Sequence, residues 1–288
     1  MEKILITGAT GLIGQELLPL LMNEYECWIV GRHMDHNKKV HFIEQDIGKL
    51  FALDKFPKQV DYIIHLAQSD GHSDFENCRN EIFNVNVHGM MQLLNYGVKA
   101  KIKKFLFASS GGVYGFVENA ALEEEAIIIS DTLNFYQNTK LCMELLARNY
   151  QMYFNIITFR FFFVYGKGQK KNMLFPKLIK SIKDKGLITV GSLKDIKINP
   201  IYSTDAAQSI YMALKNINAS DIFNISGNEI ISLGTIARKI AQQIGVDIEI
   251  KYEDKQQQDL IGDNTKMRKF LWQPQINIDR GINKLLLD

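Results

Sequence analysis

The sequence predicts a doubly wound α/β fold built on a parallel sheet, with a smaller C-terminal α/β lobe. Its 288 residues, 46% of them hydrophobic, can bury a sizeable core. Through the first half of the chain, apolar runs of strand length alternate with amphipathic stretches of helix length. The runs are rich in Ile, Val and Phe without alternating polar residues, which is typical of strands buried on both faces of a parallel sheet.

The apolar runs place the expected elements in order along the chain. Strands are expected at residues 3–7, 27–31, 40–44, 61–67, 104–110 and 155–162. Helices are expected within residues 12–23, 77–100 and 135–153. After Gly166 the pattern predicts shorter elements: a helix at 173–184, a strand at 201–203 with a helix following it to about residue 216, a strand at 222–226 and a helix at 232–244.

The change of pattern after Gly166 divides the chain into two parts. We expect residues 1–166 to form the larger domain, with 198–225 returning to it. Residues 167–197 and 226–288 are expected to form a smaller substrate-binding lobe. A cleft between two such lobes is where a small ligand binds.

Composition and charge argue against several classes of partner. The 34 basic and 32 acidic residues leave a net charge of +2 without a long basic run, so we expect no nucleic-acid partner. Cys27, Cys78 and Cys142 lie far apart and form no Cys-x-x-Cys clip, which indicates free thiols in a reducing compartment and no metal site. The start of the chain has neither a basic leader nor a long apolar stretch, so we expect a cytoplasmic protein that does not enter a membrane.

A glycine turn follows the first expected strand. TGATGLIG, residues 7 to 14, carries three glycines at three-residue spacing just before an expected helix. Glycines there permit a tight turn and a close approach of the backbone, so a pyrophosphate can bind at the positive helix N-terminus. The spacing GxxGxxG differs from the GxGxxG of the dinucleotide fingerprint, and a purely structural turn is the alternative. We predict a Rossmann-type dinucleotide site formed by Gly8, Thr10, Gly11, Leu12, Ile13 and Gly14.

Residues after two later strands are predicted to complete this site. Asp46 and Ile47 follow the third strand and suit a contact with adenine. Leu66, Ala67 and Gln68 follow the fourth strand, where they would line the path of the cofactor.

The residue after the second strand distinguishes between the two nicotinamide cofactors. NAD enzymes place a carboxylate there for the ribose 2′-OH, whereas an arginine accommodates the 2′-phosphate of NADP. In VGRH, residues 30 to 33, Arg32 can bind a phosphate through two N–H groups, and no carboxylate repels it. We therefore favour NADP(H), with NAD(H) as the second possibility. A solvated arginine at a strand end is the structural alternative.

Tyr136 and Lys140 lie four positions apart in YQNTK, which places them on one face of an expected helix. Hydride transfer at a carbinol carbon also requires a group that moves the hydroxyl proton. The unperturbed pKa of tyrosine is about 10, and lowering it to about 7 takes roughly 4 kcal/mol, which a nearby ammonium and a positive nicotinamide ring can partly supply. Two solvated neighbours have the same spacing, so the pair alone leaves both possibilities open.

Two serines end the strand expected at residues 104–110. Ser109 and Ser110 stand at the carboxyl edge of the sheet, where doubly wound folds bind their ligands. A hydroxyl at that edge can donate to a substrate oxygen and hold it in line for reaction.

The ordered motifs resemble the extended short-chain dehydrogenase/reductases, the family of NAD-dependent epimerases, dehydratases and nucleotide-sugar reductases. Four segments carry the resemblance: TGATGLIG (7–14), SSGGVYG (109–115), YQNTK (136–140) and RFFFVYG (160–166). Others extend it nearly end to end: NVNVHG (84–89), PIYSTDAA (200–207), FNISGNEIISL (223–233) and DNTKMRKFLWQP (263–274). Agreement across an ordered set is stronger than any single motif.

The resemblance implies a role for each matched residue. The family's catalytic serine or threonine corresponds to Ser110, and its tyrosine acid/base corresponds to Tyr136. Its lysine, which also holds the nicotinamide ribose, corresponds to Lys140. Ser109 would then be a strand-end or cofactor-shell residue. The resemblance also implies a homodimer formed through the helices near 77–100 and 135–153.

Departures from the family pattern narrow the expected function. Gly111 and Gly112 follow Ser110 where the family's 4,6-dehydratases carry an Asp-Glu pair, which disfavours dehydration. Phe163 stands where many epimerases and dehydratases carry a substrate-binding asparagine. Lys171 and Asn172 are left as candidates for contact with a substrate diphosphate.

We therefore expect an NADPH-dependent reductase of a nucleotide-linked 4-keto-6-deoxysugar, in which Tyr136 donates a proton to the developing alkoxide. The alternative is a nucleotide-sugar 4-epimerase that keeps NAD bound and returns hydride to the other face of the sugar. A third possibility is a non-catalytic dinucleotide sensor on the same fold. The combination of Ser110, Tyr136 and Lys140 argues against a sensor, which needs none of the three.

Overall fold

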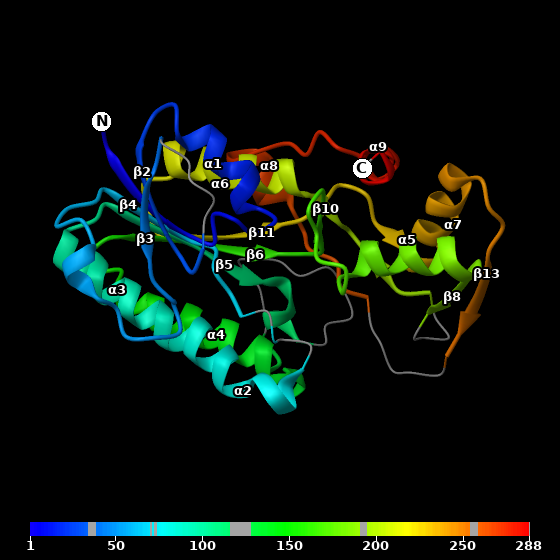
Figure 1. The fold of residues 1–288 in the computed structure, drawn as a ribbon, viewed down its shortest axis with the longest axis horizontal. Coiled ribbons are helices and arrows are strands. Elements are labelled where there is room, and N and C mark those ends of the chain that lie inside the picture. Colours follow the sequence, from blue (N-terminus) through cyan, green and yellow to red (C-terminus); the bar gives the residue numbers. More distant parts are fainter. Residues whose placement is uncertain are drawn as a thin grey trace.

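A seven-stranded parallel sheet is the centre of the computed structural model, which describes residues 1–33, 39–69, 71, 74–115, 128–190, 195–253 and 259–287 (Figure 1). The strands are β1 (Lys3–Thr7), β2 (Glu26–Gly31), β3 (His41–Glu44), β4 (Tyr62–His65), β5 (Lys104–Ser110), β6 (Asn155–Phe161) and β11 (Asp221–Ile225). Their order is β11-β6-β5-β4-β1-β2-β3, and each neighbouring pair is parallel. The predicted doubly wound fold is confirmed, and its strand order reverses between β1 and β4, where such folds bind ligands.

Helices cover both faces of the sheet. Figure 1 shows α1 (Gly14–Leu21), α6 (Ser203–Asn216) and α8 (Thr265–Phe270) on one face and α2 (Phe75–Phe83), α3 (Gly89–Ala100) and α4 (Phe135–Arg148) on the other. Successive residues of β1 enter different cores, because Ile4 and Ile6 pack with α1 and α6 while Leu5 packs with α3. Burial on both faces explains why the strand sequences lack polar alternation.

The helical stretch predicted at 77–100 is interrupted by a π-helix, Asn84–His88, between α2 and α3. Its Asn86 is buried and joins two other segments. The Asn86 Oδ1 accepts from the Ser69 N–H at 3.2 Å, and its Nδ2 donates to the Thr139 Oγ1 at 3.0 Å. A π-turn of this kind inside a helix often accompanies a functional region, and here it connects the loop after β4 to α4.

A second group of elements lies to the right of the sheet in Figure 1 and has its own hydrophobic core. Its helices are α5 (Leu174–Lys185), α7 (Leu233–Ile244) and α9 (Ile278–Leu286). Short strands pair as β7 (Val164–Tyr165) with β10 (Ile201–Tyr202), β9 (Lys197–Ile198) with β12 (Ile231–Ser232), and β8 (Leu187–Val190) with β13 (Glu249–Tyr252). Residues 203–225 return to the large sheet as α6 and β11. The proposed domain boundaries stay a prediction.

Most expected elements are present, with two shortened ends. The strand expected at 61–67 ends at His65, because the chain then crosses the glycine turn, and the helix expected at 135–153 ends at Arg148. The sequence patterns missed the short strands β7, β8, β9, β12 and β13 and the helices α8 and α9. Single 3₁₀ turns occupy Leu53–Lys55, Gly111–Tyr114 and Ser130–Thr132. Across the ranges described above, no helix has the length and apolar character needed to span a bilayer.

Candidate active site

The glycine turn after β1 contains two glycines that internal packing requires. Gly8 adopts a φ of +73°, and a Cβ on it would lie 2.6 Å from the Ala67 nitrogen. A Cβ on Gly14 would lie 2.2 Å from the Gly8 carbonyl oxygen. Gly11 differs from both, because a Cβ there would approach only the Gly8 oxygen, at 3.2 Å. The protein's own packing therefore restricts position 11 less than it restricts positions 8 and 14.

The open side of the turn fits a pyrophosphate. Gly11 and Thr10 are exposed, and Leu12 and Ile13 are half-buried. Helix α1 has Ile13 at its N-cap without a side-chain cap, so its positive end lies beside a turn that carries no bulky group at Gly11. Backbone N–H groups and a helix dipole next to open space are what a phosphate anion requires. The residues present therefore fit a dinucleotide at the predicted position.

The turns after β2 and β3 place three predicted cofactor residues. Arg32 is exposed directly after β2. Asp46 is half-buried, and its Oδ1 accepts from the Gly48 N–H at 2.9 Å. Ile47 is buried against α3, where a Cβ on Gly89 would lie 2.5 Å from the Ile47 Cγ2. Ile47 therefore packs the turn onto the helix layer, and the adenine contact of both residues stays a prediction.

The loop after β4 crosses the glycine turn and reaches α4. The Leu66 N–H donates to the Thr7 carbonyl at 3.0 Å, and the Ala67 N–H donates to the Thr7 Oγ1 at 3.3 Å. Next in the chain, Gln68 accepts a hydrogen bond from the Tyr136 hydroxyl through its Oε1, at 2.8 Å. A residue predicted to line the cofactor's path thus contacts the predicted acid/base.

A capping box fixes the start of α4 next to Tyr136. The Asn134 Oδ1 accepts from the Gln137 N–H at 3.0 Å, and the Gln137 Oε1 accepts from the Asn134 N–H at 2.8 Å. The predicted shared face of Tyr136 and Lys140 is present, with the Lys140 Nζ 5.8 Å from the centre of the tyrosine ring. Lys140 is fully buried, and its Nζ donates to the Ala108 carbonyl at 2.9 Å. The pair is therefore not two solvated neighbours.

Burial shifts both groups of the pair toward their neutral forms. Desolvation lowers the pKa of Lys140 to about 7, although the charge of Glu144 opposes this shift. Desolvation also raises the pKa of the Tyr136 phenol above its usual value of 10. Without a cofactor, burial therefore opposes the lowering of the Tyr136 pKa that the lysine ammonium was expected to supply in part.

The two serines at the end of β5 differ in orientation. Ser110 is half-buried, and its Oγ accepts from the Gly112 N–H at 3.1 Å, capping the 3₁₀ turn that follows. Ser109 is buried, and its Oγ donates to the Glu144 Oε1 at 2.5 Å. The Ser109 hydroxyl is thus used inside the protein, whereas its predicted place in the cofactor shell stays a prediction.

A buried ion pair behind these residues was missed by the sequence patterns. The Arg160 Nη2 lies 2.6 Å from the Glu144 Oε2, and the side chains are 2% and 1% exposed. The Arg160 Nε donates to the Glu144 Oε1 at 3.0 Å, and its guanidinium lies 4.6 Å from the centre of the Tyr114 ring. One signal was available: an arginine inside the apolar run FRFF has to find a buried partner.

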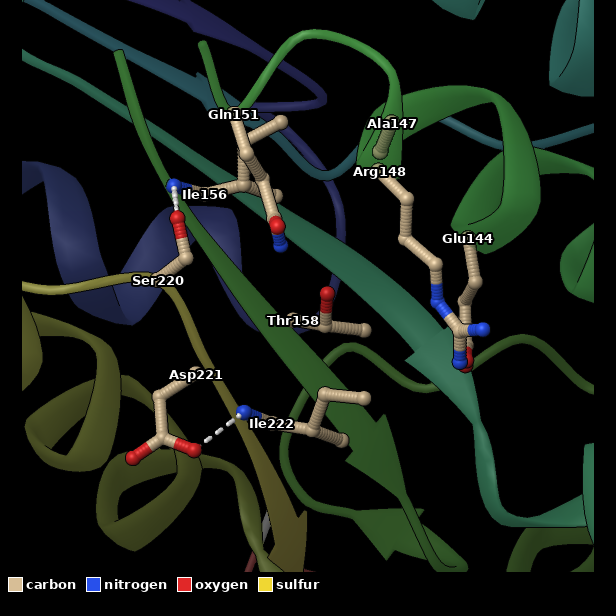
Figure 2. A pocket seen from close by; sticks show the side chains of 9 residues that line it. All are labelled: Glu144, Ala147, Arg148, Gln151, Ile156, Thr158, Ser220, Asp221 and Ile222. Carbon is tan, nitrogen blue, oxygen red and sulfur yellow. Dashed lines mark hydrogen bonds between the residues drawn. The ribbon is translucent and has the colours of Figure 1, made fainter.

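A cavity of about 230 Å³ lies beside this ion pair, between α4 and the strands β6 and β11 (Figure 2). Glu144 and Arg148 line it from α4, and Asp221 lines it from β11. Ser110, Tyr136 and Lys140 are not among its lining residues. The cavity is therefore distinct from the predicted reaction site.

The glycines after Ser110 are closely packed. A Cβ on Gly111 would lie 2.4 Å from the ring of Phe162, which is fully buried. A Cβ on Gly112 would lie 2.8 Å from the Gln137 Nε2. An acidic pair at these positions would therefore require the Phe162 ring to move, and the expectation that dehydration is disfavoured stays a prediction.

The residue that replaces the family's substrate-binding asparagine and the two predicted diphosphate contacts are all at the surface. Phe163 is 37% exposed, with a φ of +44° that is unusual for a residue other than glycine. Lys171 and Asn172 are exposed in the turn before α5. Their contacts with substrate stay predictions.

The family model for the NAD dependent epimerase/dehydratase family matches residues 4–226. The chain belongs to this family. A GDP-6-deoxy-D-talose 4-dehydrogenase of Aggregatibacter actinomycetemcomitans is 29% identical over 228 residues, which are 77% of this chain and 74% of that protein. A human dTDP-D-glucose 4,6-dehydratase is 24% identical over 266 residues, covering 84% and 74% of the two chains.

Solved structures of epimerases have the same fold. A UDP-glucuronic acid 4-epimerase from Bacillus cereus in complex with NAD is 25% identical, with a TM-score of 0.86 over 98% of this chain and 97% of that one. Membership of the family makes the chain an enzyme of the extended short-chain dehydrogenase/reductase type that uses a nicotinamide dinucleotide. The family includes epimerases, dehydratases and dehydrogenases, so its name leaves the reaction open.

Proposed function

We propose that the chain is a reductase of a nucleotide-linked 4-keto-6-deoxysugar. The observation that carries this proposal is the position of Tyr136 beside the buried Lys140 on one face of α4, where its hydroxyl can give a proton to a substrate oxygen. A protonated acid at the site suits a reaction that begins by giving a proton away. The similarity to a GDP-6-deoxy-D-talose 4-dehydrogenase supports chemistry at C4 of a 6-deoxysugar.

Each residue of the site has a role in this reaction. When bound, the nicotinamide dinucleotide supplies the hydride that adds to the carbonyl carbon. Ser110 donates a hydrogen bond to the carbonyl oxygen and holds it in line. Tyr136 gives its hydroxyl proton to the same oxygen, so the carbonyl becomes a hydroxyl and the tyrosine becomes a phenolate. A protonated Lys140, whose Nζ lies 5.8 Å from the ring centre, stabilises that phenolate.

The proposed cofactor preference rests on Arg32. The comparisons favour NAD, since the Bacillus cereus epimerase was solved with it. However, the residue after β2 makes the distinction, and here an exposed arginine follows Gly31 without a carboxylate at 31–33. We therefore propose NADP(H) as the preferred cofactor of this chain, with NAD(H) as the alternative.

A nucleotide-sugar 4-epimerase is the second candidate, favoured by the similarity to a UDP-glucuronic acid 4-epimerase. An epimerase regenerates its cofactor in each cycle, whereas a reductase consumes one NADPH for each keto group. Dehydration is not proposed, although a dehydratase is among the relatives, because an Asp-Glu pair does not fit at Gly111 and Gly112.

The deciding experiment incubates the purified protein with NADPH or NADH and a panel of nucleotide-linked 4-keto sugars. Stoichiometric consumption of reduced cofactor supports the reductase. Tightly bound cofactor that copurifies, with interconversion of 4-hydroxy sugars and no net consumption, supports the epimerase instead.

Tyr136→Phe tests the proposed proton donor. Turnover should fall by about 100-fold or more, because general acid catalysis contributes at least this much, while cofactor binding stays nearly intact. Tyr153→Phe, at an exposed position after α4, is the matched control and should keep its turnover. Near-normal turnover of Tyr136→Phe would remove this residue from the mechanism.

The proposal also includes assembly and location. We propose a homodimer formed through α2 and α4, whose outer surfaces expose Phe75, Phe83 and Leu145. We propose the cytoplasm as its location, because the free thiols of Cys27, Cys78 and Cys142 stay reduced there.

A further inference from the structure

We propose that Gln68 is a positioning residue that holds the hydroxyl of Tyr136 and supports it in both its protonated and its ionised form. The inference rests on the proposed role of Tyr136 as acid. The structural observation behind the proposal is the hydrogen bond from the Tyr136 hydroxyl to the Gln68 Oε1, at 2.8 Å. Nothing in the family comparison assigns a role to this contact.

The backbone before Gln68 is fixed by the sheet. Leu66 and Ala67 both donate their N–H groups to Thr7, one to its carbonyl and one to its Oγ1. The chain can pass this close only because position 8 is glycine, where a Cβ would lie 2.6 Å from the Ala67 nitrogen. The glycine turn thus sets the position of Gln68 relative to the cofactor site.

The backbone after Gln68 is tied to α4 through buried polar groups. The Ser69 N–H donates to the Asn86 Oδ1, and the Asn86 Nδ2 donates to the Thr139 Oγ1 at 3.0 Å. The Thr139 Oγ1 in turn donates to the carbonyl of Tyr136 at 2.7 Å. Together with the Gln68 contact, these bonds form a closed ring from the loop to the tyrosine and back. Such a ring orients the amide before any ligand binds.

An amide is suited to both forms of the tyrosine. Its oxygen accepts from a phenol, and after the amide turns over, its NH₂ group donates to a phenolate. A carboxylate can only accept, and a thioether of similar length forms neither strong bond. When Tyr136 gives its proton to the substrate oxygen, the Gln68 Nε2 can therefore stabilise the phenolate until solvent returns a proton.

Other charged or titratable groups surround the tyrosine from each neighbouring element. Lys140 lies on the same helix face and donates to Ala108. Glu144 is one turn further along α4 and is paired with Arg160 of β6. His65, at the end of β4, is buried, and Glu81 of α2 accepts from the Ser69 hydroxyl at 2.9 Å. These groups remain the same in the variants below, so a change can be assigned to position 68.

Titration of Tyr136 in the complex with NADP⁺, whose positive ring lowers the pKa of the tyrosine, tests the proposal without measuring activity. Tyrosine labelled with ¹³C at Cζ reports ionisation by NMR, and Tyr136→Phe identifies its signal among the 11 tyrosines. Gln68→Glu should raise the pKa of Tyr136 by about one pH unit or more, because a carboxylate disfavours the phenolate. Gln68→Met should raise it less, through loss of the donor to the phenolate.

Gln137→Glu is the matched control. It also introduces a carboxylate beside Tyr136, but one held by the Asn134 N–H in the capping box, so the shift should be smaller than in Gln68→Glu. The pH profile of turnover should move in the order wild type, Gln68→Met, Gln68→Glu. Equal titration of Tyr136 in the wild type and both Gln68 variants would overturn the inference.

The two proposals fail in different ways. If the Gln68 variants shift the titration but Tyr136→Phe remains active, the contact is real and the proposed function is wrong. If Tyr136→Phe is inactive but Tyr136 titrates equally in the wild type and the Gln68 variants, the function stands and the role of Gln68 is wrong.

Discussion

Lys140 is fully buried, and no ion pair with the carboxylate of Glu144 offsets the cost of burying its ammonium. Glu144 is held by Arg160, and the Lys140 Nζ donates to the Ala108 carbonyl instead. Burial therefore lowers the pKa of Lys140 from 10.5 to about 7. Between these two pH values the unfolded chain binds a proton that the folded chain does not. Stability should consequently rise with pH across this window, since the cost of burying the ammonium disappears.

Lys140→Met removes this dependence. The unfolding free energy of the wild type minus that of the variant should increase between about pH 7 and pH 10. The slope of this difference with pH should approach about 1.4 kcal/mol per pH unit. Urea unfolding of the cofactor-free proteins at several pH values measures the difference. Lys177→Met, at an exposed position of α5, serves as the control. A difference that is constant over the window would show that Lys140 is not desolvated.

Arg32→Asp tests the cofactor preference. A carboxylate after β2 would repel a 2′-phosphate and accept from a ribose 2′-OH, so the ratio of kcat/KM for NADPH to that for NADH should fall by about tenfold or more. Arg148→Asp, on an exposed position of α4, controls for the change in net charge. An unchanged ratio in Arg32→Asp would leave NAD, which the known structures favour, as the better assignment.

At the level of residues, sequence spacing predicted contacts within an element but not between elements. The interval from Tyr136 to Lys140 requires a shared helix face, and the structure confirms it. The interaction of Ser109 with Glu144 and Arg160 depends on the register of β5 against β6, in which Ser109 pairs with Arg160. No local pattern contains that register, so Glu144 was missed although it follows Lys140 by one helical turn.

Among the elements, the 3₁₀ turn after β5 joins that strand to the buried Phe162. Gly111 lies against its ring, and Ser110 caps the turn through the Gly112 N–H. A side chain at position 111 would therefore displace both the ring and the serine. The position of Ser110 depends on the glycine that follows it.

Gly111→Ala should lower the unfolding free energy by about 1–3 kcal/mol, as is typical of overpacking in a core. Turnover should fall as well, because Ser110 moves with the turn. Gly31→Ala provides a control for stability, since a Cβ there has its nearest neighbour at 3.9 Å. Thermal or urea unfolding measures the effect. A Gly111→Asp variant of unchanged stability would reopen the possibility of a dehydratase.

Elements with a strong local pattern were predicted to within a few residues. Strands β1 and β5 have the expected bounds, and α5 and α7 begin within a residue of theirs. The pairing of β8 with β13 joins residues about 60 positions apart, as in Leu187 with Glu249. The β8 segment LITV has only four residues, and the β13 segment EIKY has no apolar run. The π-turn at Asn84–His88 was also invisible, because helical periodicity continues across it.

At the scale of the whole molecule, α4 has a buried face, which carries Lys140 of the proposed site, and an exposed outer face. Its inner side buries Lys140, Met143 and Glu144, while Leu145 on the outer side is 49% exposed. Helix α2 packs next to α4, where the rings of Phe75 and Phe135 are 4.9 Å apart between centres. An exposed apolar surface of this kind in an enzyme is typical of an interface between identical subunits.

Leu145→Glu should convert a dimer into monomers, because a two-fold axis brings each new carboxylate near the apolar surface of the partner and leaves it without a counter-ion. The dissociation constant of the dimer should rise by about tenfold or more, which corresponds to about 1.4 kcal/mol. Sedimentation velocity at several concentrations measures the assembly state. Leu287→Glu changes an equally apolar residue that is 79% exposed directly after α9, in the second group of elements, and should leave the dimer intact. If the wild type sediments as a monomer, or if both variants remain dimeric, the outer face of α4 is not the interface.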